Sequence, residues 1–447
     1  MTAPMNTTDV LADFVSGITY ESLPPELIAR VKRQCLDLIG VAIAGSGQDA
    51  AVTTRSLIGP PGAESATVWG TDLHTTIPDA AFVNATAAHA LDFDDMWLPG
   101  AHPSAPILPG AVAIAESRGL SGRELIAAMV AGYEIMGRLH SVVSGRFGWH
   151  PTGVFGSFGS VAACSRLLGL DPSRTAMAFG IASSMTGGID GHSGTMTKPL
   201  HAGLAAHAGT RAALLADAGF TASDHVFDGK RSFFESFFPS VTPQNWRLTA
   251  DLGVTYYLLN PGIGIKMYPA GYYMHQTFEA ALQIVVDNAL GPDDVESIRI
   301  GAPSTGFRFD RPFPKSSLDA KFSLQFMATA AVIFQRLSSD LFDDDIVSRD
   351  DVRSMLSRIQ VYAEPNLPAN PDIAQNPVTI TTRNGDVFGA TVSMPKSHWR
   401  YPLPRQAWID KFRRNVGDLA DPDALIDRIE RLEEITDIRE ITRLLST

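Results

Sequence analysis

The stretch LIARVKRQCLDL, residues 27–38, decides the fold class of this 447-residue chain. Apolar residues recur in it every three or four positions, at Leu27, Val31, Cys35 and Leu38. That spacing is the period of an amphipathic α-helix. It continues to about residue 265 in a background rich in Ala, Leu and Gly, which predicts closely packed helices. Further helices are predicted at Asp79–Phe93, Ala105–Arg118, Gly122–Val142, Gly153–Leu168, Ser173–Met185 and Leu200–Ala218.

A smaller region after Lys266 has a different pattern. The segments Val378–Thr382 and Val387–Val392 flank an Asn-Gly pair, which suits the positive φ angles of a tight hairpin turn. This region is therefore predicted to mix helix and sheet. One helix and two more strands are predicted before the hairpin, at Met274–Asn288, Val295–Ile300 and Ile359–Val361.

The C-terminal segment from Tyr401 returns to charged amphipathic helix, at Asp423–Glu434 and Ile435–Leu445. We expect it to pack back onto the first helical region. The chain is thus predicted to be mainly α. A large all-helical domain comprises residues 1–265 and 400–447, and a smaller α+β domain comprises residues 266–399.

Composition and charge narrow the classes of partner. The 36 Lys and Arg residues against 48 Asp and Glu give a net charge of −12 and a pI of about 5.4. This charge repels nucleic acid and anionic lipid, so any polyanionic substrate needs a local concentration of cations. Two cysteines are too few for a disulfide framework, and neither an export signal nor an apolar run of membrane-spanning length is visible. We expect a cytoplasmic protein.

The densest polar cluster is HALDFDD at residues 89–95, followed by HPSAP at residues 102–106. At helical spacing His89, Asp92 and Asp95 share one face. One interpretation is an Asp-rich magnesium site, although no second acidic motif and no basic phosphate clamp accompany it. A helix end with solvated acids is another interpretation. A third is a loop that lines a pocket, because apolar residues follow the acids.

Three further segments carry candidate groups. His150 precedes Pro151 at a predicted helix N-terminus, where free amides attract anions. Lys198 enters a helix after a loop rich in glycine and hydroxyl groups, and Lys266 lies at the junction of the two domains. A structural histidine and solvated lysines are the alternative interpretations of these segments. There is no P-loop, dinucleotide fingerprint, nucleophile elbow or His-Glu-x-x-His motif.

Taken in order, these segments resemble the MmgE/PrpD family over nearly the whole chain. The resemblance is carried by CLDLIGVA (35–42), HALDFDD (89–95), HPSAPILP (102–109), TMTKPLHAG (195–203) and KMYP (266–269). It implies a large helical domain built from both ends of the chain and capped by a smaller α+β lid. It also implies a homodimer that uses no metal and no organic cofactor.

The resemblance further implies an active site between the domains. We expect catalytic roles for Asp92, His102, His150 and Lys198. The cations would hold a small di- or tricarboxylate and stabilise enolate-like charge, while a histidine or lysine moves a proton. Substrate contacts are expected from Lys266, Met96, Ser104, Thr197 and His275.

Three departures from the family pattern bear on the reaction. Met96 stands where a threonine is usual, Gly271 where lyases place a polar group, and Phe326 where a tyrosine is common. Because these changes remove proton donors, the sequence favours an epimerase of an iminodisuccinate-like dicarboxylate. The alternatives are a lyase resembling 2-methylcitrate dehydratase or cis-aconitate decarboxylase, and a non-catalytic dimeric carboxylate-binding protein.

Overall fold

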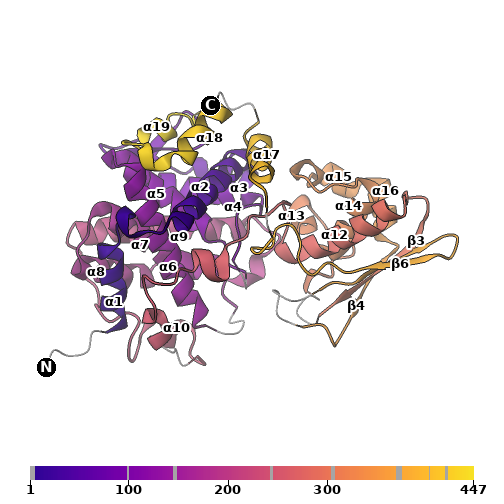
Figure 1. Ribbon diagram of the computed structural model, residues 1–447, viewed down its shortest axis with the longest axis horizontal. Coiled ribbons are helices and arrows are strands. Elements are labelled where there is room, and N and C mark those ends of the chain that lie inside the picture. Colours follow the sequence, from indigo (N-terminus) through magenta and orange to yellow (C-terminus); the bar gives the residue numbers. More distant parts are fainter. Residues whose placement is uncertain are drawn as a thin grey trace.

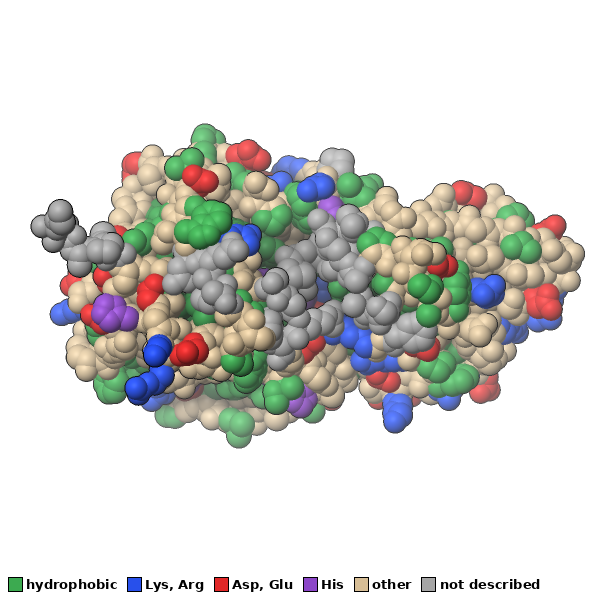
Figure 2. Space-filling view, turned by 90° about the horizontal axis from the view of Figure 1, so that it is seen from below, with side chains coloured by type: hydrophobic (Ala, Val, Ile, Leu, Met, Phe, Trp, Pro, Cys, Tyr) green, Lys and Arg blue, Asp and Glu red, His purple; other side chains and the backbone are tan. Residues whose placement is uncertain are grey.

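The chain is mainly helical and forms a large lobe and a small lobe that lie side by side (Figure 1). The computed structural model describes residues 6–97, 100–143, 148–241, 245–303, 308–368, 375–401, 403–417 and 421–446. Figure 2 shows the narrowing where the two lobes meet, with basic side chains exposed beside it.

The centre of the large lobe is a set of closely packed helices. Helix α7 packs against α6 and α9, and α4 packs against α5 and α9. Small residues permit this approach, as predicted: a β-carbon at Gly209 would lie 2.6 Å from the carbonyl oxygen of Ser157. The central helices are α4 (Ile77–Ala90), α5 (Ser104–Arg118), α6 (Gly122–Ser141), α7 (Pro151–Leu168) and α9 (Thr197–Asp217).

Outer helices surround this centre, and the C-terminal helices join them. Helices α17 and α18 pack against α2 of the large lobe. Only four residues of the predicted helix 435–445 form α19. The outer helices are α1 (Thr7–Gly17), α2 (Pro25–Gly45), α3 (Asp49–Arg55), α8 (Pro172–Ser183), α10 (Phe233–Phe237), α11 (Asn245–Thr249), α17 (Arg405–Val416), α18 (Pro422–Glu430) and α19 (Arg439–Thr442).

The large lobe is not entirely helical, contrary to the sequence-based prediction. Strands β1 (Ser65–Thr67) and β2 (His74–Thr76) pair in antiparallel fashion. Each strand has three residues, which is too short for an alternating pattern to stand out.

The small lobe contains a four-stranded sheet in the order β4-β3-β5-β6. Strand β3 is parallel to β4 and antiparallel to β5, and β5 forms the predicted hairpin with β6. In Figure 1 the helices of this lobe lie to one side of the sheet, and α12 and α14 pack against its strands. The elements are α12 (Tyr272–Asp287), β3 (Val295–Ala302), α13 (Ser317–Ala320), α14 (Leu324–Ile333), α15 (Asp344–Ser348), α16 (Asp350–Leu356), β4 (Ile359–Ala363), β5 (Val378–Thr382) and β6 (Val387–Ala390).

Each lobe has its own hydrophobic core. One large cluster of buried residues runs from Leu11 to Leu445, and a second runs from Ala270 to Ile380. Domain limits at 265/266 and 399/400 stay a prediction. Among the described residues, no single helix is long and apolar enough to cross a membrane. Helices α2 and α3, bent by 84° relative to each other, meet the length and composition criteria only as a pair.

Candidate active site

The loop that follows α4 positions the acidic cluster. Asp92 has a φ of +52°, a left-handed conformation that aspartate tolerates better than most residues. The buried Lys411 side chain supports the next residue: its Nζ donates to the carbonyl oxygen of Phe93 at 2.8 Å and pairs with Asp37 at 2.7 Å. The C-terminal helix α17 therefore helps to fix the backbone of the site.

Asp92 joins the two lysines that the sequence singles out. Its Oδ1 accepts from Lys266 Nζ at 2.6 Å and from Lys198 Nζ at 3.3 Å. All three side chains are buried. Burial alone would raise the pKa of Asp92, but the ammonium groups of Lys198 and Lys266 outweigh it and hold this pKa well below the usual range. An ionised carboxylate thus holds two cations at one point of the interior.

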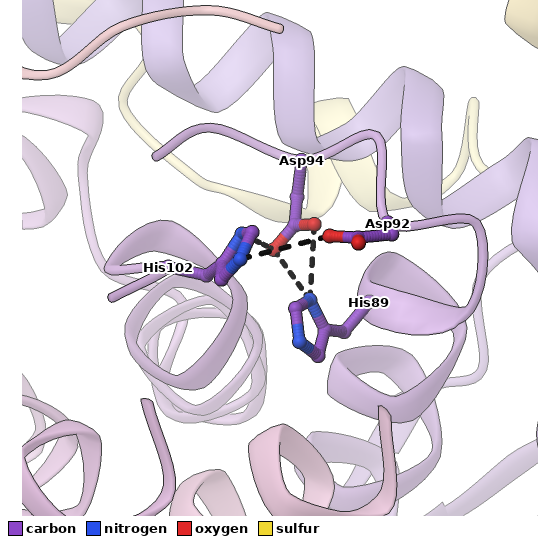
Figure 3. Close-up of side chains that lie close together, drawn as sticks. All are labelled: His89, Asp92, Asp94 and His102. Atoms are coloured by element: carbon purple, nitrogen blue, oxygen red, sulfur yellow. Dashed lines mark hydrogen bonds and ion pairs between the residues drawn. The ribbon is translucent and has the colours of Figure 1, made fainter. Parts of the chain in front are cut away.

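His89 and Asp94 extend this network (Figure 3). The Nδ1 of His89 lies 2.9 Å from Asp94 Oδ2, and its Nε2 lies 2.8 Å from Lys198 Nζ. Because lysine is the donor in the second contact, we assign the His89 proton to Nδ1, which then donates to Asp94. Burial lowers the pKa of His89, although Asp94 opposes that effect. His89 is therefore a neutral bridge between an acid and a lysine.

His102 is placed to accept a proton. Its Nδ1 lies 2.9 Å from the carbonyl oxygen of Asp95, so this nitrogen donates and Nε2 carries the lone pair. Burial is the largest cause that lowers the pKa of His102 to about 3, so the ring is neutral near pH 7. Two carboxylates lie close: Asp94 Oδ2 is 3.3 Å from Nδ1, and Asp92 Oδ1 is 3.6 Å from Nε2. These carboxylates would stabilise the imidazolium formed when Nε2 takes a proton.

His150 supplies a second neutral imidazole. It is the residue before α7, and its ring lies 5.8 Å from that of His89. Burial is the largest of the causes that hold the pKa of His150 well below its usual value, and the charge of Lys198 adds to it. Its Nδ1 lies 3.1 Å from Nδ1 of His201 on α9.

A small cavity of about 70 Å³ lies where these groups meet, at the seam between the lobes. It is bounded by six of the predicted site residues: Asp92, Met96, His102, His150, Lys198 and Lys266. The large lobe also contributes an aspartate and a serine, and aromatic side chains come from the small lobe. The other lining residues are Gly100, Asp190, Ser193, Gly271, Tyr272, Tyr273, Arg308, Phe309 and Phe322.

The other three predicted substrate contacts are not among the lining residues. The hydroxyl of Ser104 bonds to Asp95 and lies 2.6 Å from the hydroxyl of Tyr133. Both ring nitrogens of His275 have hydrogen-bond partners: Nδ1 lies 2.8 Å from the hydroxyl of Ser397, and Nε2 lies 3.1 Å from the carbonyl oxygen of Ala270. Thr197 begins α9, where its backbone nitrogen donates to a neighbouring threonine hydroxyl. Contact of these three residues with substrate stays a prediction.

Sequence reasoning missed two cations near the site. Arg308 lines the cavity and forms an ion pair with Asp190 at 3.0 Å, which links the two lobes. Lys321 is 3% exposed, and its Nζ donates to the carbonyl oxygens of Leu91 and Pro269, both at 3.0 Å. Burial lowers the pKa of Lys321 to about 7. Nothing in the sequence around Lys321, which follows α13 and precedes Phe322, indicates that its side chain is buried.

The three departures from the family pattern acquire different weights. Met96 and Gly271 line the cavity, so both affect its shape and polarity. Phe326 is fully buried on α14, with its ring 5.4 Å from that of Phe342, and is not a lining residue. Its missing hydroxyl therefore carries no argument about the reaction, contrary to the sequence-based reasoning. Tyr272 and Tyr273 also line the cavity.

Four side chains could hold a metal ion by proximity alone: His89, Asp92, Asp94 and His102 offer ligand atoms within 4.8 Å of one another (Figure 3). The chemistry of the donors argues against it. Asp92 already accepts from two lysines, and Nε2 of His89 already accepts from Lys198. A dication here would have to displace or deprotonate these ammonium groups.

The fold and the cavity define a class: a two-lobed, mainly helical protein with buried carboxylates, lysines and imidazoles around a cavity at the seam of the lobes. Residues 9–245 match the MmgE/PrpD N-terminal domain, and residues 268–434 match the MmgE/PrpD C-terminal domain. The chain belongs to the MmgE/PrpD family.

Individual relatives are similar over most of their length. A cis-aconitate decarboxylase of Mus musculus is 32% identical over 461 residues, covering 98% of this chain and 93% of the relative. The cis-aconitate decarboxylase of Homo sapiens is 32% identical, covering 98% and 94%. A 2-methylcitrate dehydratase of Cupriavidus necator is 27% identical, covering 91% and 90%.

Proposed function

We propose that this protein is a lyase that removes carbon dioxide from cis-aconitate or a closely related unsaturated tricarboxylate. The observation that carries this proposal is the buried pair Lys198 and Lys266 around Asp92, flanked in one cavity by the neutral rings of His102 and His150. The two decarboxylases at 32% identity support this reaction over others in the family.

The charges of the site suit this substrate. Lys198 and Lys266 both pair with Asp92, and Lys198 also feels the charge of Asp94, so a bound trianion must find further positive charge. Arg308, at the edge of the cavity, supplies part of it when it turns from Asp190 to a substrate carboxylate. Lys198, Lys266 and Arg308 are the cations through which the site would overcome the repulsion that the net charge of −12 predicts for a polyanion.

The reaction follows from the same groups. Breaking the bond to one carboxylate releases carbon dioxide and leaves its electron pair on an allylic fragment, where the remaining carboxylates spread the charge. The ammonium groups of Lys198 and Lys266 stabilise that charge. An imidazole N–H then protonates the end of the allylic fragment away from the broken bond. The trianion and one proton thus become a dianion and carbon dioxide. Each positioned acid contributes on the order of 10²- to 10⁴-fold in rate.

Epimerisation of an iminodisuccinate-like dicarboxylate is the second candidate. It is favoured by the presence of two separate neutral imidazoles, His102 and His150, on one cavity, because an epimerase takes a proton from one face and returns it to the other. Loss of water from a 2-methylcitrate-like substrate is a third outcome, which the dehydratase relatives support.

We further propose that the small lobe acts as a lid. The cavity of about 70 Å³ is much smaller than the roughly 300–1,000 Å³ of ordinary ligand pockets, so the lobes must separate to admit a tricarboxylate. A homodimer and a cytoplasmic location also stay predictions.

One experiment separates these reactions. The purified protein is incubated in D₂O with cis-aconitate, 2-methylcitrate or iminodisuccinate, and carbon dioxide release and proton NMR spectra are followed. Decarboxylation predicts carbon dioxide together with one deuterium per product molecule. Deuterium exchange at the α-carbon of iminodisuccinate without carbon dioxide release would replace this proposal with epimerisation. No turnover of any of the three would leave the binding-protein alternative.

A further inference from the structure

Three histidines form a path from the cavity to the surface of the large lobe. His150 lines the cavity, and its Nδ1 lies 3.1 Å from Nδ1 of His201. The ring of His201 lies 5.8 Å from that of His192. His150 and His201 are 4% and 5% exposed, whereas His192 is partly exposed. The path thus leads from the interior outward.

The contact between the first two rings is held in place by the backbone. The amide of His150 donates to the carbonyl oxygen of Gly188 at 2.9 Å. A β-carbon at Gly188 would lie 3.0 Å from Cγ of His201, so this glycine lets the chain pass directly against that ring. The backbone around Gly188 therefore holds the two residues close together.

A distance of 3.1 Å between two Nδ1 atoms requires that one nitrogen carries a proton and the other does not. When His201 holds the shared proton, a neutral His150 carries its own proton on Nε2 and is an acid toward the cavity. When His150 holds the shared proton, its Nε2 is bare and is a base. Burial lowers the pKa of His201 to about 4 and that of His150 as well, so both rings are neutral near pH 7.

The proposed decarboxylation consumes one proton in each turnover, and the small cavity has to receive it while closed. His102 is poorly placed to deliver it, because its Nδ1 is tied to a backbone carbonyl and Asp92 and Asp94 lie beside the ring. Among the described residues, His150 is the cavity imidazole whose second nitrogen meets another imidazole.

We propose that His201 relays the proton that His150 gives to the substrate, with His192 and solvent as the source; this inference rests on the proposed function. The Nε2 proton of His150 goes to the substrate carbon as the shared proton moves from His201 Nδ1 to His150 Nδ1. A proton from His192 or water binds His201 Nε2. When product leaves, solvent returns a proton to His150 Nε2 and removes one from His201 Nε2, while the shared proton moves back from His150 Nδ1 to His201 Nδ1, which restores the starting pair.

The test is His201→Asn in the full-length protein. Asparagine keeps one polar atom near the position of Nδ1 and so preserves a hydrogen bond to His150, but it has no second nitrogen and cannot relay. We expect kcat to fall at least tenfold with KM changed less than twofold, and added imidazole to restore part of the rate. The matched control is His207→Asn on the same helix, which lies outside the cavity and should keep wild-type kinetics.

The outcomes distinguish the relay from the function. A wild type that decarboxylates, with His201→Asn at the same kcat, overturns the relay and leaves the function intact. If the wild type turns over none of the tested acids, the proposed function fails, and the solvent exchange rate of the His150 ring proton by NMR decides the relay instead. Exchange as fast in His201→Asn as in the wild type overturns it, and slower exchange supports a path through His201.

Discussion

Replacing Lys321 with Met tests the electrostatics beneath the site. The ammonium group of Lys321 has backbone carbonyls as its hydrogen-bond partners, and burial lowers its pKa from 10.5 to about 7. Between pH 7 and pH 10.5 Lys321 is mostly protonated in the unfolded chain and mostly deprotonated in the folded chain. The free energy of unfolding therefore rises with pH in this range. Taking both pKa values, the wild type gains about 3 kcal/mol of unfolding free energy from this residue between pH 6 and pH 9.

The Lys321→Met variant loses this gain. It also leaves two backbone carbonyl oxygens without their donor, at a cost of about 1–3 kcal/mol each that does not depend on pH. Urea unfolding gives the change in unfolding free energy between pH 6 and pH 9 for the wild type and for the variant. Subtracting one change from the other cancels the contributions of the other titrating groups and leaves that of Lys321. Lys315→Met, at an exposed position six residues earlier, is the control and should keep the wild-type dependence.

Equal pH dependence in Lys321→Met and the wild type would refute the reasoning. It would mean that Lys321 keeps an ordinary pKa in the folded protein, and hence that water or a carboxylate reaches it.

Three further predictions concern the site and the packing. Asp92→Asn should cost about 3–5 kcal/mol of unfolding free energy in urea, because Lys198 and Lys266 lose their shared counter-charge, and should lower kcat by at least 100-fold; a cost below 1 kcal/mol would contradict this. Dialysis against EDTA should leave kcat unchanged, and recovery of a lost activity by a divalent metal would speak for a metal in the His89 cluster. Gly209→Ala should destabilise the protein by about 1–3 kcal/mol in thermal unfolding, whereas Gly17→Ala, which meets open space, should be nearly neutral.

Local sequence signals predicted most of the fold. The β5–β6 hairpin lies where its Asn-Gly turn placed it, because that signal is contained within a few residues. Most central helices are likewise close to their predicted limits; α9, for example, begins three residues before the predicted Leu200, whereas the predicted helix 435–445 is reduced to the four residues of α19. Strands β1 and β2 were not predicted because three residues are too few to show an alternating pattern.

The site was predictable only where a motif marked it. The lysines and histidines carried over by resemblance do meet at one cavity, although they come from distant parts of the chain. Lys321 and Arg308 were missed because their importance depends on burial and on contact across the lobes, which single-sequence patterns do not encode. His201 belongs to the segment TMTKPLHAG, but its partner His150 lies 51 residues away in the chain.

The contact of Lys411 with the Phe93 carbonyl has a consequence for synthesis of the protein. The residue that steadies the acidic loop leaves the ribosome more than 300 residues after the loop itself. Until Lys411 has been synthesised, the carboxylate of Asp37 lacks the ion-pair partner that it has in the folded protein. Burying this carboxylate is unfavourable before then. A chain truncated before residue 411 should therefore be bound by chaperones and cleaved by proteases more readily than the full-length chain. The full-length chain should become active only after its C-terminal segment has docked.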